Sequence, residues 1–420
     1  MRKILFLWLL LGLNNSFGQI EEVRRITQTL CSPQFHGRGY VNRGDSIAAE
    51  FIASEFRKIG LKPLKGEYFQ SFPLDVNTFP GAMSIQLNGA ELKPGIDYLV
   101  DPGSAGGNYD LRPKWISIST ALDPDALIRE IKEILSEDYH NAVLFDFRNF
   151  GADTLKKVAG LTQAIAGIIP VIEVTNKKFT WSVEASQLAF PLIQVSDAVY
   201  SENPVLSIKI DSKLIKGYTS RNVFGYLPAK KKTKNTLIFS AHYDHLGRMG
   251  FNTYFPGGND NASGTAMLIS MAKYFKEHPS DYNILFIAFA GEEAGLVGSK
   301  YFVEHPKVKL KKINFMVNLD IMGSGEEGIT VVNATLFKEQ FELLQTINSD
   351  KQLLAAVKSR GPAANSDHYW FTEKGVPAFF IYTMGPNKNY HDVHDTYENL
   401  SFVEYQDITT LLVEFVERLK

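Results

Sequence analysis

Residues 215–420 alternate short apolar, β-rich runs with stretches of helical periodicity. The runs that we expect to form strands are 236–241, 283–290, 313–319 and 378–383, and the expected helices are 262–277 and 402–419. Strands that alternate with helices in this way are typical of a mostly parallel sheet with helices on its faces. The sequence therefore predicts an α/β fold, a three-layer α/β/α sandwich around a mostly parallel central sheet.

A different type of sequence interrupts this pattern between residues 84 and 214. Short β-like runs dominate there, one helix is expected at 153–166, and no cluster of candidate metal ligands occurs. A chain of 420 residues has room for about two to three domains. We therefore expect a main domain formed by 19–83 and 215–420, with 84–214 inserted into it as a smaller β-rich domain.

Two helix boundaries of the main domain carry capping signals. Asp45 is expected to cap a helix that Gly60 ends. Ser401 followed by Glu404 has the spacing of a capping box, which predicts that the last helix begins at these residues.

The first 18 residues have the order of a signal peptide. Arg2 and Lys3 are positively charged, 4–13 is an apolar run too short to span a bilayer, and Ser16 and Gly18 are small residues that suit cleavage. We therefore expect export to the periplasm or the cell exterior. No later stretch is long and apolar enough to predict a membrane span. Cys31 is the only cysteine, which excludes an internal disulfide.

The charge balance excludes nucleic acid as an expected partner. The 44 Lys and Arg residues and 46 Asp and Glu residues give a formal net charge of -2. Binding to a phosphate backbone needs a basic face, and nothing in this composition indicates one. The oligomeric state stays open.

Acidic residues and histidines follow the expected strands of the main domain. In an open α/β sheet, a functional site lies beyond the carboxyl ends of the strands. The polar residues at these ends, or in the loops beside them, are His242, Asp244, Asp260, Glu292, Glu293, Asp320 and His391. Each one alone has an ordinary explanation, such as a core histidine, a helix cap or a surface turn. Together they fall at one edge of the expected sheet, which predicts a shared site.

The residue types in this set are those that zinc prefers. Zinc binds imidazole nitrogen and carboxylate oxygen, and a catalytic zinc keeps one position open for water. A carboxylate can bridge two metals, so two histidines and three acids complete two three-ligand sites when one acid is shared. A further carboxylate, Glu292 or Glu293, can then act as a general base. At this point His245 and His394 are competing ligands, and His368 is a candidate for a supporting role.

Five segments around these residues resemble those of the zinc-dependent aminopeptidase family, which is related to glutamate carboxypeptidase-like enzymes and glutaminyl cyclases. They occur in the family's order and read SAHYDHLG at 240–247, GNDNASG at 258–264, GEEAGLVGS at 291–299, NLDIMG at 318–323 and YHDVHD at 390–395. The resemblance covers roughly residues 215–400 and the stretch 30–61. As a set these segments are specific to the family.

The resemblance implies a centre with two zinc ions. One ion would be bound by His242 and Asp320, the other by Glu293 and His391, and Asp260 would bridge the two. The family's spacing between its last ligand and a following Asp fits His391 and not His394.

The catalytic residues that the resemblance implies are Glu292, Asp244 and Tyr390. Glu292 would move the proton from the attacking water to the leaving amine. Asp244 would orient the ring of His242, as carboxylates behind metal-binding histidines do. Tyr390 would donate a hydrogen bond to the tetrahedral intermediate. More loosely, the inserted domain resembles a protease-associated domain.

The expected function is that of a secreted metallo-exopeptidase, a zinc-dependent aminopeptidase that removes N-terminal residues from peptides. A carboxypeptidase of the same architecture would need cationic groups near the metals, and Arg248 and Arg360 are available. A glutaminyl cyclase usually has a one-metal site. A non-catalytic binding ectodomain would have lost metal ligands, whereas this sequence retains the full set.

Overall fold

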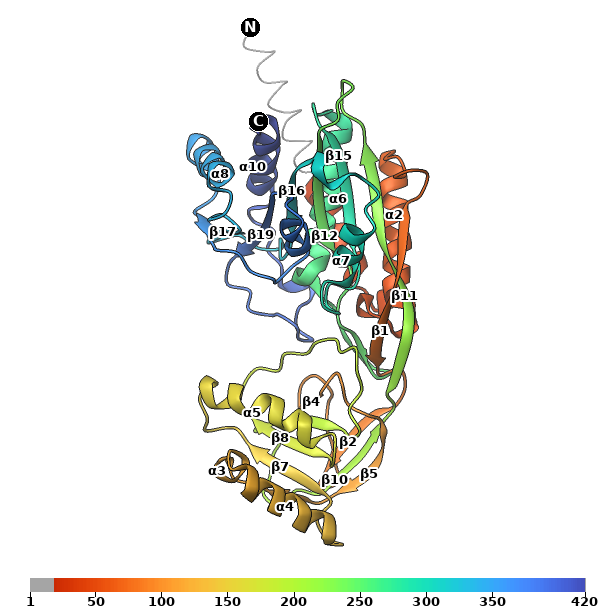
Figure 1. Ribbon diagram of the computed structural model, residues 1–420, viewed down its shortest axis with the longest axis vertical. Helices are drawn as coiled ribbons and strands as arrows, with labels where there is room; N and C mark the ends of the chain where they lie inside the picture. The colour runs from red at the N-terminus through yellow and green to blue at the C-terminus, as the bar shows by residue number, and fades with distance from the viewer. Residues whose placement is uncertain (1–18, 420) are drawn as a thin grey trace.

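The computed structural model describes residues 19–419, which form two parts joined by the long strands β1 (Phe69–Thr78) and β11 (Lys213–Leu227) (Figure 1). One part is built on an eight-stranded sheet, and the other, lower in Figure 1, holds a five-stranded and a four-stranded sheet. The expected signal peptide lies outside the described residues. Within 19–419, no helix has the length and apolar character needed to cross a membrane.

The eight-stranded sheet has the strand order β1-β11-β15-β12-β16-β19-β17-β18. The strands at its centre are parallel to one another and are β15 (Asn283–Phe289), β12 (Thr236–His242), β16 (Ile313–Leu319) and β19 (Ala378–Met384). They correspond to the four strands expected from the sequence. The sheet is antiparallel towards both sides, where β11 pairs with β15 and β17 (Gly328–Val332) pairs with β19, and β18 (Val357–Ser359) runs parallel to β17.

Helices cover both faces of this sheet. On one face a hydrophobic cluster takes side chains from α2 (Gly44–Ile59), α6 (Gly264–Glu277), α8 (Lys338–Lys351) and α10 (Tyr405–Arg418), and on the other from α7 (Val297–Glu304) and α9 (His368–Glu373). Along β12, Leu237 and Phe239 belong to the first cluster and Ile238 to the second. Successive side chains of a strand point to opposite faces, so the sheet is the middle of three layers. The predicted α/β fold is confirmed.

The part between β1 and β11 carries helices as well as strands. Its sheets have the orders β4-β9-β8-β7-β6 and β3-β2-β10-β5. The strands are β2 (Met83–Leu87), β3 (Ala90–Glu91), β4 (Tyr98–Val100), β5 (Gly107–Leu111), β6 (Pro113–Trp115), β7 (Ala142–Asp146), β8 (Val171–Thr175), β9 (Leu192–Ser196) and β10 (Leu206–Ile210), and the helices are α3 (Ile118–Ala121), α4 (Pro124–Ser136) and α5 (Ala152–Ile165). The helix expected at 153–166 is α5. The domain boundaries at 84 and 214 stay a prediction.

The two parts share a hydrophobic cluster. Trp181 of the part between β1 and β11 stacks on Phe255 of the other part, with ring centroids 4.6 Å apart. Phe255 lies on β14 (Thr253–Phe255), which forms a hairpin with β13 (Gly247–Met249) directly after the segment of His242. The hairpin therefore connects the core between the two parts to the edge of the large sheet.

Both capping predictions need correction. Asp45 lies inside α2, after the N-cap residue Arg43, and its carboxylate accepts hydrogen bonds from Tyr218 and Ser220 of β11. The last helix begins at Tyr405 without a side-chain cap, so the capping box of Ser401 and Glu404 is not formed. Tertiary contacts prevent the capping box from forming. Phe402 is buried, has φ of 52° and donates its backbone N–H to the carbonyl of Gly323, which keeps this residue out of the helix. Gly60 ends α2 as predicted, with φ of 83°.

Candidate metal centre

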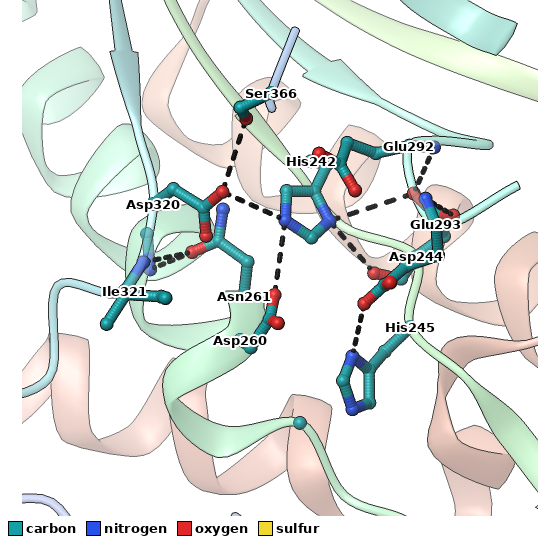
Figure 2. Close-up of polar contacts among 12 residues, drawn as sticks. His242, Asp244, His245, Asp260, Asn261, Glu292, Glu293, Asp320, Ile321 and Ser366 are labelled. Carbon is teal, nitrogen blue, oxygen red and sulfur yellow. Dashed lines mark hydrogen bonds and ion pairs between the residues drawn. The ribbon is translucent and has the colours of Figure 1, made fainter. Parts of the chain in front are cut away.

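Side chains from separate segments meet at the carboxyl ends of β12, β15 and β16 (Figure 2). Nε2 of His242 lies 3.3 Å from Asp260 Oδ1 and 3.3 Å from Asp320 Oδ2. Nε2 of His391 lies 3.1 Å from Asp260 Oδ2 and 3.1 Å from Glu293 Oε2. The structure thus brings the five expected ligands together, and Asp260 presents one carboxylate oxygen to each histidine.

The other ring nitrogen of each histidine faces a backbone carbonyl. Nδ1 of His242 lies 3.1 Å from the carbonyl oxygen of Asp244, and Nδ1 of His391 lies 2.8 Å from that of Trp181. A carbonyl can only accept a hydrogen bond, so both Nδ1 atoms carry a proton and donate it. Each Nε2 is therefore the nitrogen available to a metal ion, oriented as in other metal sites by the contact behind the ring.

The loop that presents Asp260 is fixed from two sides. It belongs to the irregular turn Gly258–Ser263 before α6, and the Asp260–Asn261 peptide bond is cis. The carboxylate of Asp395 accepts hydrogen bonds from the backbone N–H groups of Asn259 and Asp260, at 2.8 and 3.0 Å. On the other side the fully buried guanidinium of Arg38 donates to the carbonyl oxygens of Pro256, Gly257 and Asp260. Arg38 was not predicted from the sequence, because its contacts with this loop are all to main-chain oxygens.

Asp320 has one oxygen engaged and one free. Oδ2 faces His242 and accepts a hydrogen bond from Ser366, at 3.2 Å, whereas Oδ1 is buried without a hydrogen-bond partner within 19–419. The next residue, Ile321, has φ of 55°, which is rare for a β-branched side chain. Asn261 accepts a hydrogen bond from the backbone N–H of Ile321 and stabilises this turn. Ser366 was not among the residues predicted for the site, although it lies two residues before His368.

Asp244 takes a different position from the one expected. Its Oδ1 lies 3.9 Å from Nδ1 of His242, which is too long for a hydrogen bond, so the backbone carbonyl of Asp244 orients the ring instead. Its carboxylate accepts the backbone N–H groups of Glu292 and Glu293, at 3.2 and 3.4 Å, and the hydroxyl of Tyr40 at 3.4 Å. Asp244 therefore contacts the main chain of the glutamate pair.

The other histidines considered as ligands differ in burial and in their contacts. His245 is buried, and its Nδ1 lies 2.8 Å from Oε1 of Glu293, the oxygen that His391 does not contact. Nε2 of His245 has no hydrogen-bond partner within 19–419. His394 is exposed. His368 is buried against Phe380, with ring centroids 5.4 Å apart, and contacts none of the five ligands.

A segment of the part between β1 and β11 contacts the loop of His391. The backbone N–H of Trp181 donates to the carbonyl of His391 at 2.9 Å, so the two residues are joined by a pair of hydrogen bonds. Lys178 forms an ion pair with Asp392 at 2.6 Å and donates to the carbonyl of Tyr390 at 3.3 Å. Nothing in the sequence marks these contacts, because most of them use main-chain atoms.

Buried charges shift one another's pKa values in this cluster. Burial lowers the pKa of His391, but Glu293 and Asp260 outweigh this effect and raise it to about 11. Burial raises the pKa of Glu293, but His391 and His245 outweigh it and lower the pKa to about 2. Burial also raises the pKa of Glu292 well above its ordinary value, against the opposing charge of His242. The raised pKa of Glu292 suits this carboxyl group to hold and release a proton.

The cluster opens into a cavity of about 270 Å³. Beyond the ligand candidates and Glu292, its wall consists of Ile321, Arg360, Asn365, Phe380, Tyr382 and Tyr390. The ring of Tyr390 stacks on His391, with centroids 3.9 Å apart. Tyr390 therefore lies where the sequence placed it, at the wall of the site, although its part in catalysis stays a prediction.

The donor set fits zinc. The described residues include three groups whose ligand atoms could hold one ion: His242 with Asp260 and Asp320, His242 with Glu292 and Glu293, and His245 with Asp260 and Glu293. Imidazole nitrogen and carboxylate oxygen are zinc ligands, and the unpartnered buried Oδ1 of Asp320 is an atom that a cation would satisfy. In protein crystal structures, zinc ligands are held from behind as His242 and His391 are here.

Residues 222–416 match the sequence model of Peptidase family M28. This part of the chain is similar to that family. Aminopeptidase YwaD of Bacillus subtilis (strain 168) is 27% identical to the chain over 320 residues, which are 68% of each protein. A probable zinc metalloprotease of Pyrenophora teres f. teres (strain 0-1) is 23% identical over 333 residues, 70% of this chain and 65% of the relative. The chain thus spans about two thirds of the length of these two relatives.

Solved structures share the fold of both parts of this chain. The structure of BSAP, a zinc aminopeptidase from Bacillus subtilis, superposes with a TM-score of 0.68 and 22% identity and covers 94% of this chain and 93% of that one. An aminopeptidase from Aneurinibacillus sp. strain AM-1 gives a TM-score of 0.62 at 19% identity, covering 94% and 92%. The family recognised from the sequence is confirmed, and so is the expected enzyme class, a hydrolase of the zinc aminopeptidase family.

Proposed function

We propose that the protein is an exported aminopeptidase with two zinc ions, and that the five ligands are divided as the sequence suggested. The observation that carries this proposal is the position of Asp260, with Oδ1 3.3 Å from His242 and Oδ2 3.1 Å from His391. A carboxylate between two imidazoles is the arrangement that a bridged pair of metals requires. Asp320 would complete the first site and Glu293 the second.

The chain's own residues supply proton transfer and orientation. Glu292 takes the proton of the attacking water and delivers it to the leaving amine, for which its raised pKa is suited. Asp244 holds the backbone of Glu292 and so fixes where this carboxylate lies. Tyr390, at the cavity wall, donates a hydrogen bond to the developing oxyanion. When bound, zinc lowers the pKa of water from 15.7 to about 7 and polarises the scissile carbonyl.

The size and charge of the cavity support cleavage at the N-terminus. Its volume of about 270 Å³ is at the lower limit of ligand pockets, which span roughly 300–1,000 Å³. It therefore suits one terminal residue better than a long peptide segment. Glu292 lines it as well and is not assigned to a metal, so its carboxylate can attract a protonated α-amine.

We further propose that residues 84–214 are an inserted domain of the protease-associated type and that 19–83 and 215–420 form the peptidase domain. The long pairing of β1 with β11, from Phe69 and Val223 to Thr78 and Lys213, supports this division because it joins the two parts by one ribbon. Export rests on the order of charged, apolar and small residues in 1–18.

Metal analysis combined with a peptide assay tests the proposal. The purified protein should contain two zinc ions per chain and should release the first residue of a peptide with a free N-terminus, but not of its N-acetylated form. Removal of zinc by a chelator should abolish hydrolysis, and added zinc should restore it. Equal cleavage of free and acetylated peptides would exclude recognition of the amine.

A carboxypeptidase is the second candidate, because one of the two arginines that it would need lies in the cavity. Arg360 lines the same cavity as His242 and Asp320, whereas Arg248 lies outside it and contacts His36. Release of the last residue from an N-acetylated peptide with a free C-terminus would favour this candidate over the aminopeptidase.

A further inference from the structure

Arg360 projects from the rigid edge of the large sheet into the metal cavity. It follows β18, and its backbone N–H donates to the carbonyl of Val331 on the neighbouring strand β17 at 2.9 Å. Its Nη1 donates to the hydroxyl of Tyr382 on β19 at 3.3 Å. Both ends of the residue are thus held by neighbouring strands, and the guanidinium keeps the rest of its hydrogen-bond donors for other partners.

The charge of Arg360 is unusual for this cavity. Of the described residues that line the cavity, Arg360 is the one lysine or arginine. Within 19–419 it forms no ion pair with a carboxylate, although most other arginines of this region pair with an acid or stack on an aromatic ring. The acidic residues of the cavity face the two histidines instead. An exposed arginine without an acidic partner, beside a substrate cavity, is suited to bind an anion.

The wall beside Arg360 restricts the kind of anion. Ile321 and Phe380 are apolar, and Tyr382 and Asn365 are polar, so the cavity that holds the metal ligands and Arg360 has both apolar and polar wall. A short aliphatic stem that ends in a carboxylate has both kinds of surface. Arginine binds a carboxylate through two parallel hydrogen bonds, which makes it more selective than a lysine at the same place.

We propose that Arg360, oriented by Tyr382, binds a carboxylate of the substrate. This deepens the proposed function and rests on it. Two parts of a short peptide carry a carboxylate close to its first residue: the acidic side chain of that terminal residue, and the C-terminal carboxylate of a dipeptide. In both cases Arg360 determines specificity and does not take part in proton transfer.

Two matched substrate pairs test the proposal and distinguish the sources. The first pair is Glu-Ala-Ala-amide and Gln-Ala-Ala-amide, which differ only in the side-chain carboxylate. The second is Leu-Gly and Leu-Gly-amide, which differ only in the C-terminal carboxylate. For each pair the readout is the ratio of kcat/KM for the acid to that for the amide, measured in the native enzyme and in Arg360→Gln, Arg360→Lys and Tyr382→Phe.

In Arg360→Gln we expect the ratio of one pair to fall by about tenfold to a hundredfold, the usual effect of losing a hydrogen bond to a charged group. Arg360→Lys should recover part of it, and Tyr382→Phe should lower it less. The matched control is Arg248→Gln, an arginine outside the cavity, which should leave both ratios unchanged. The pair that responds identifies the source of the carboxylate. Unchanged ratios for both pairs in Arg360→Gln would overturn the proposal.

A binding measurement separates this proposal from the proposed function. Isothermal titration calorimetry gives the Kd values of free glutamate, glutamine and Leu-Gly for the zinc-loaded Glu292→Gln protein, which should not hydrolyse the peptide, and for the same protein with Arg360→Gln. If the native enzyme does not hydrolyse the peptides, the proposed aminopeptidase activity fails. Weaker binding of glutamate or Leu-Gly to Arg360→Gln, with glutamine unaffected, would still support Arg360 as the carboxylate site. Equal binding of all three to both proteins would overturn it.

Discussion

The two histidines of the metal centre are held in different ways. His242 ends a central strand, its side chain is 1% exposed, and the carbonyl behind its ring belongs to Asp244, two residues away. His391 lies in a loop with φ of 55°, its side chain is 11% exposed, and the carbonyl behind its ring belongs to Trp181, 210 residues away. The first half of the centre is thus a property of the sheet. The second half depends on contact with the part of the chain between β1 and β11.

The part of the chain between β1 and β11 is therefore coupled to the metal site. Trp181 is anchored by stacking on Phe255 and by a hydrogen bond from its indole N–H to Val100. A change in the position of that part would therefore move the carbonyl that orients His391. The His242 half has no such dependence, since its contacts come from β12, β16 and the segment of Ser366.

The variant Asp260→Asn should have the largest effect, because Asp260 belongs to both halves. The amide can offer one oxygen but not two, so we expect zinc content to fall from two ions to at most one per chain. Loss of a metal's charge stabilisation is worth several kcal/mol, which corresponds to a loss of activity on the order of a thousandfold. Zinc analysis and kcat/KM measure the two effects, and retention of both ions would contradict the bridge.

The variant Glu292→Gln should separate chemistry from metal binding. Glu292 is assigned to proton transfer, whose removal typically costs about a hundredfold to ten-thousandfold in rate. Both zinc ions should remain, since Glu292 belongs to neither half of the centre. The matched control is the neighbouring Glu293→Gln, which should lose the ion of the His391 half. Full activity of Glu292→Gln would refute its role.

The sequence predicted the central sheet because this sheet depends on local order, whereas the choice of the five ligands came from the resemblance to the zinc-dependent aminopeptidase family. Strands that alternate with helices determine a parallel sheet, and parallel strands place the residues after them at one edge. His242 ends β12, Asp320 directly follows β16 and the glutamate pair lies shortly after β15, so the strand pattern accounts for their position at one edge of the sheet.

The contacts behind the ligands were not predictable in the same way. Arg38 and Trp181 act on the site through main-chain carbonyls, which every residue possesses, so no residue type reveals the partner. Tertiary contacts also explain why two local predictions were wrong. Asp45 was expected to cap a helix but binds Tyr218, and Phe402 was expected to be helical but donates a hydrogen bond to Gly323.

The variant Lys178→Met tests the dependence of the His391 half on the second part. Lys178 pairs with Asp392, the neighbour of His391, at 2.6 Å. Outer contacts of metal ligands typically contribute tenfold to a hundredfold in metal affinity, and this more distant one should contribute about tenfold. Chelator competition should show weaker binding of one zinc ion and an unchanged second. The exposed neighbour Lys177→Met is the control, and equal weakening in both variants would indicate a general effect of charge.

The variant Ser366→Ala should have the smallest effect and should fall on the opposite half. Ser366 donates to Asp320 at 3.2 Å and accepts a hydrogen bond from Asn318 at 2.8 Å. The donor is a neutral hydroxyl and zinc shares the charge of the accepting carboxylate, so this hydrogen bond should contribute about 0.5–1.5 kcal/mol, which corresponds to a change of roughly twofold to tenfold in the affinity of the His242 half for zinc. The same chelator competition should therefore show weaker binding of one zinc ion. This ion should be the one whose binding Lys178→Met leaves unchanged. If both variants weaken the same ion, the two halves are not held independently, and the distinction between a half fixed by the sheet and a half fixed across the two parts must be given up.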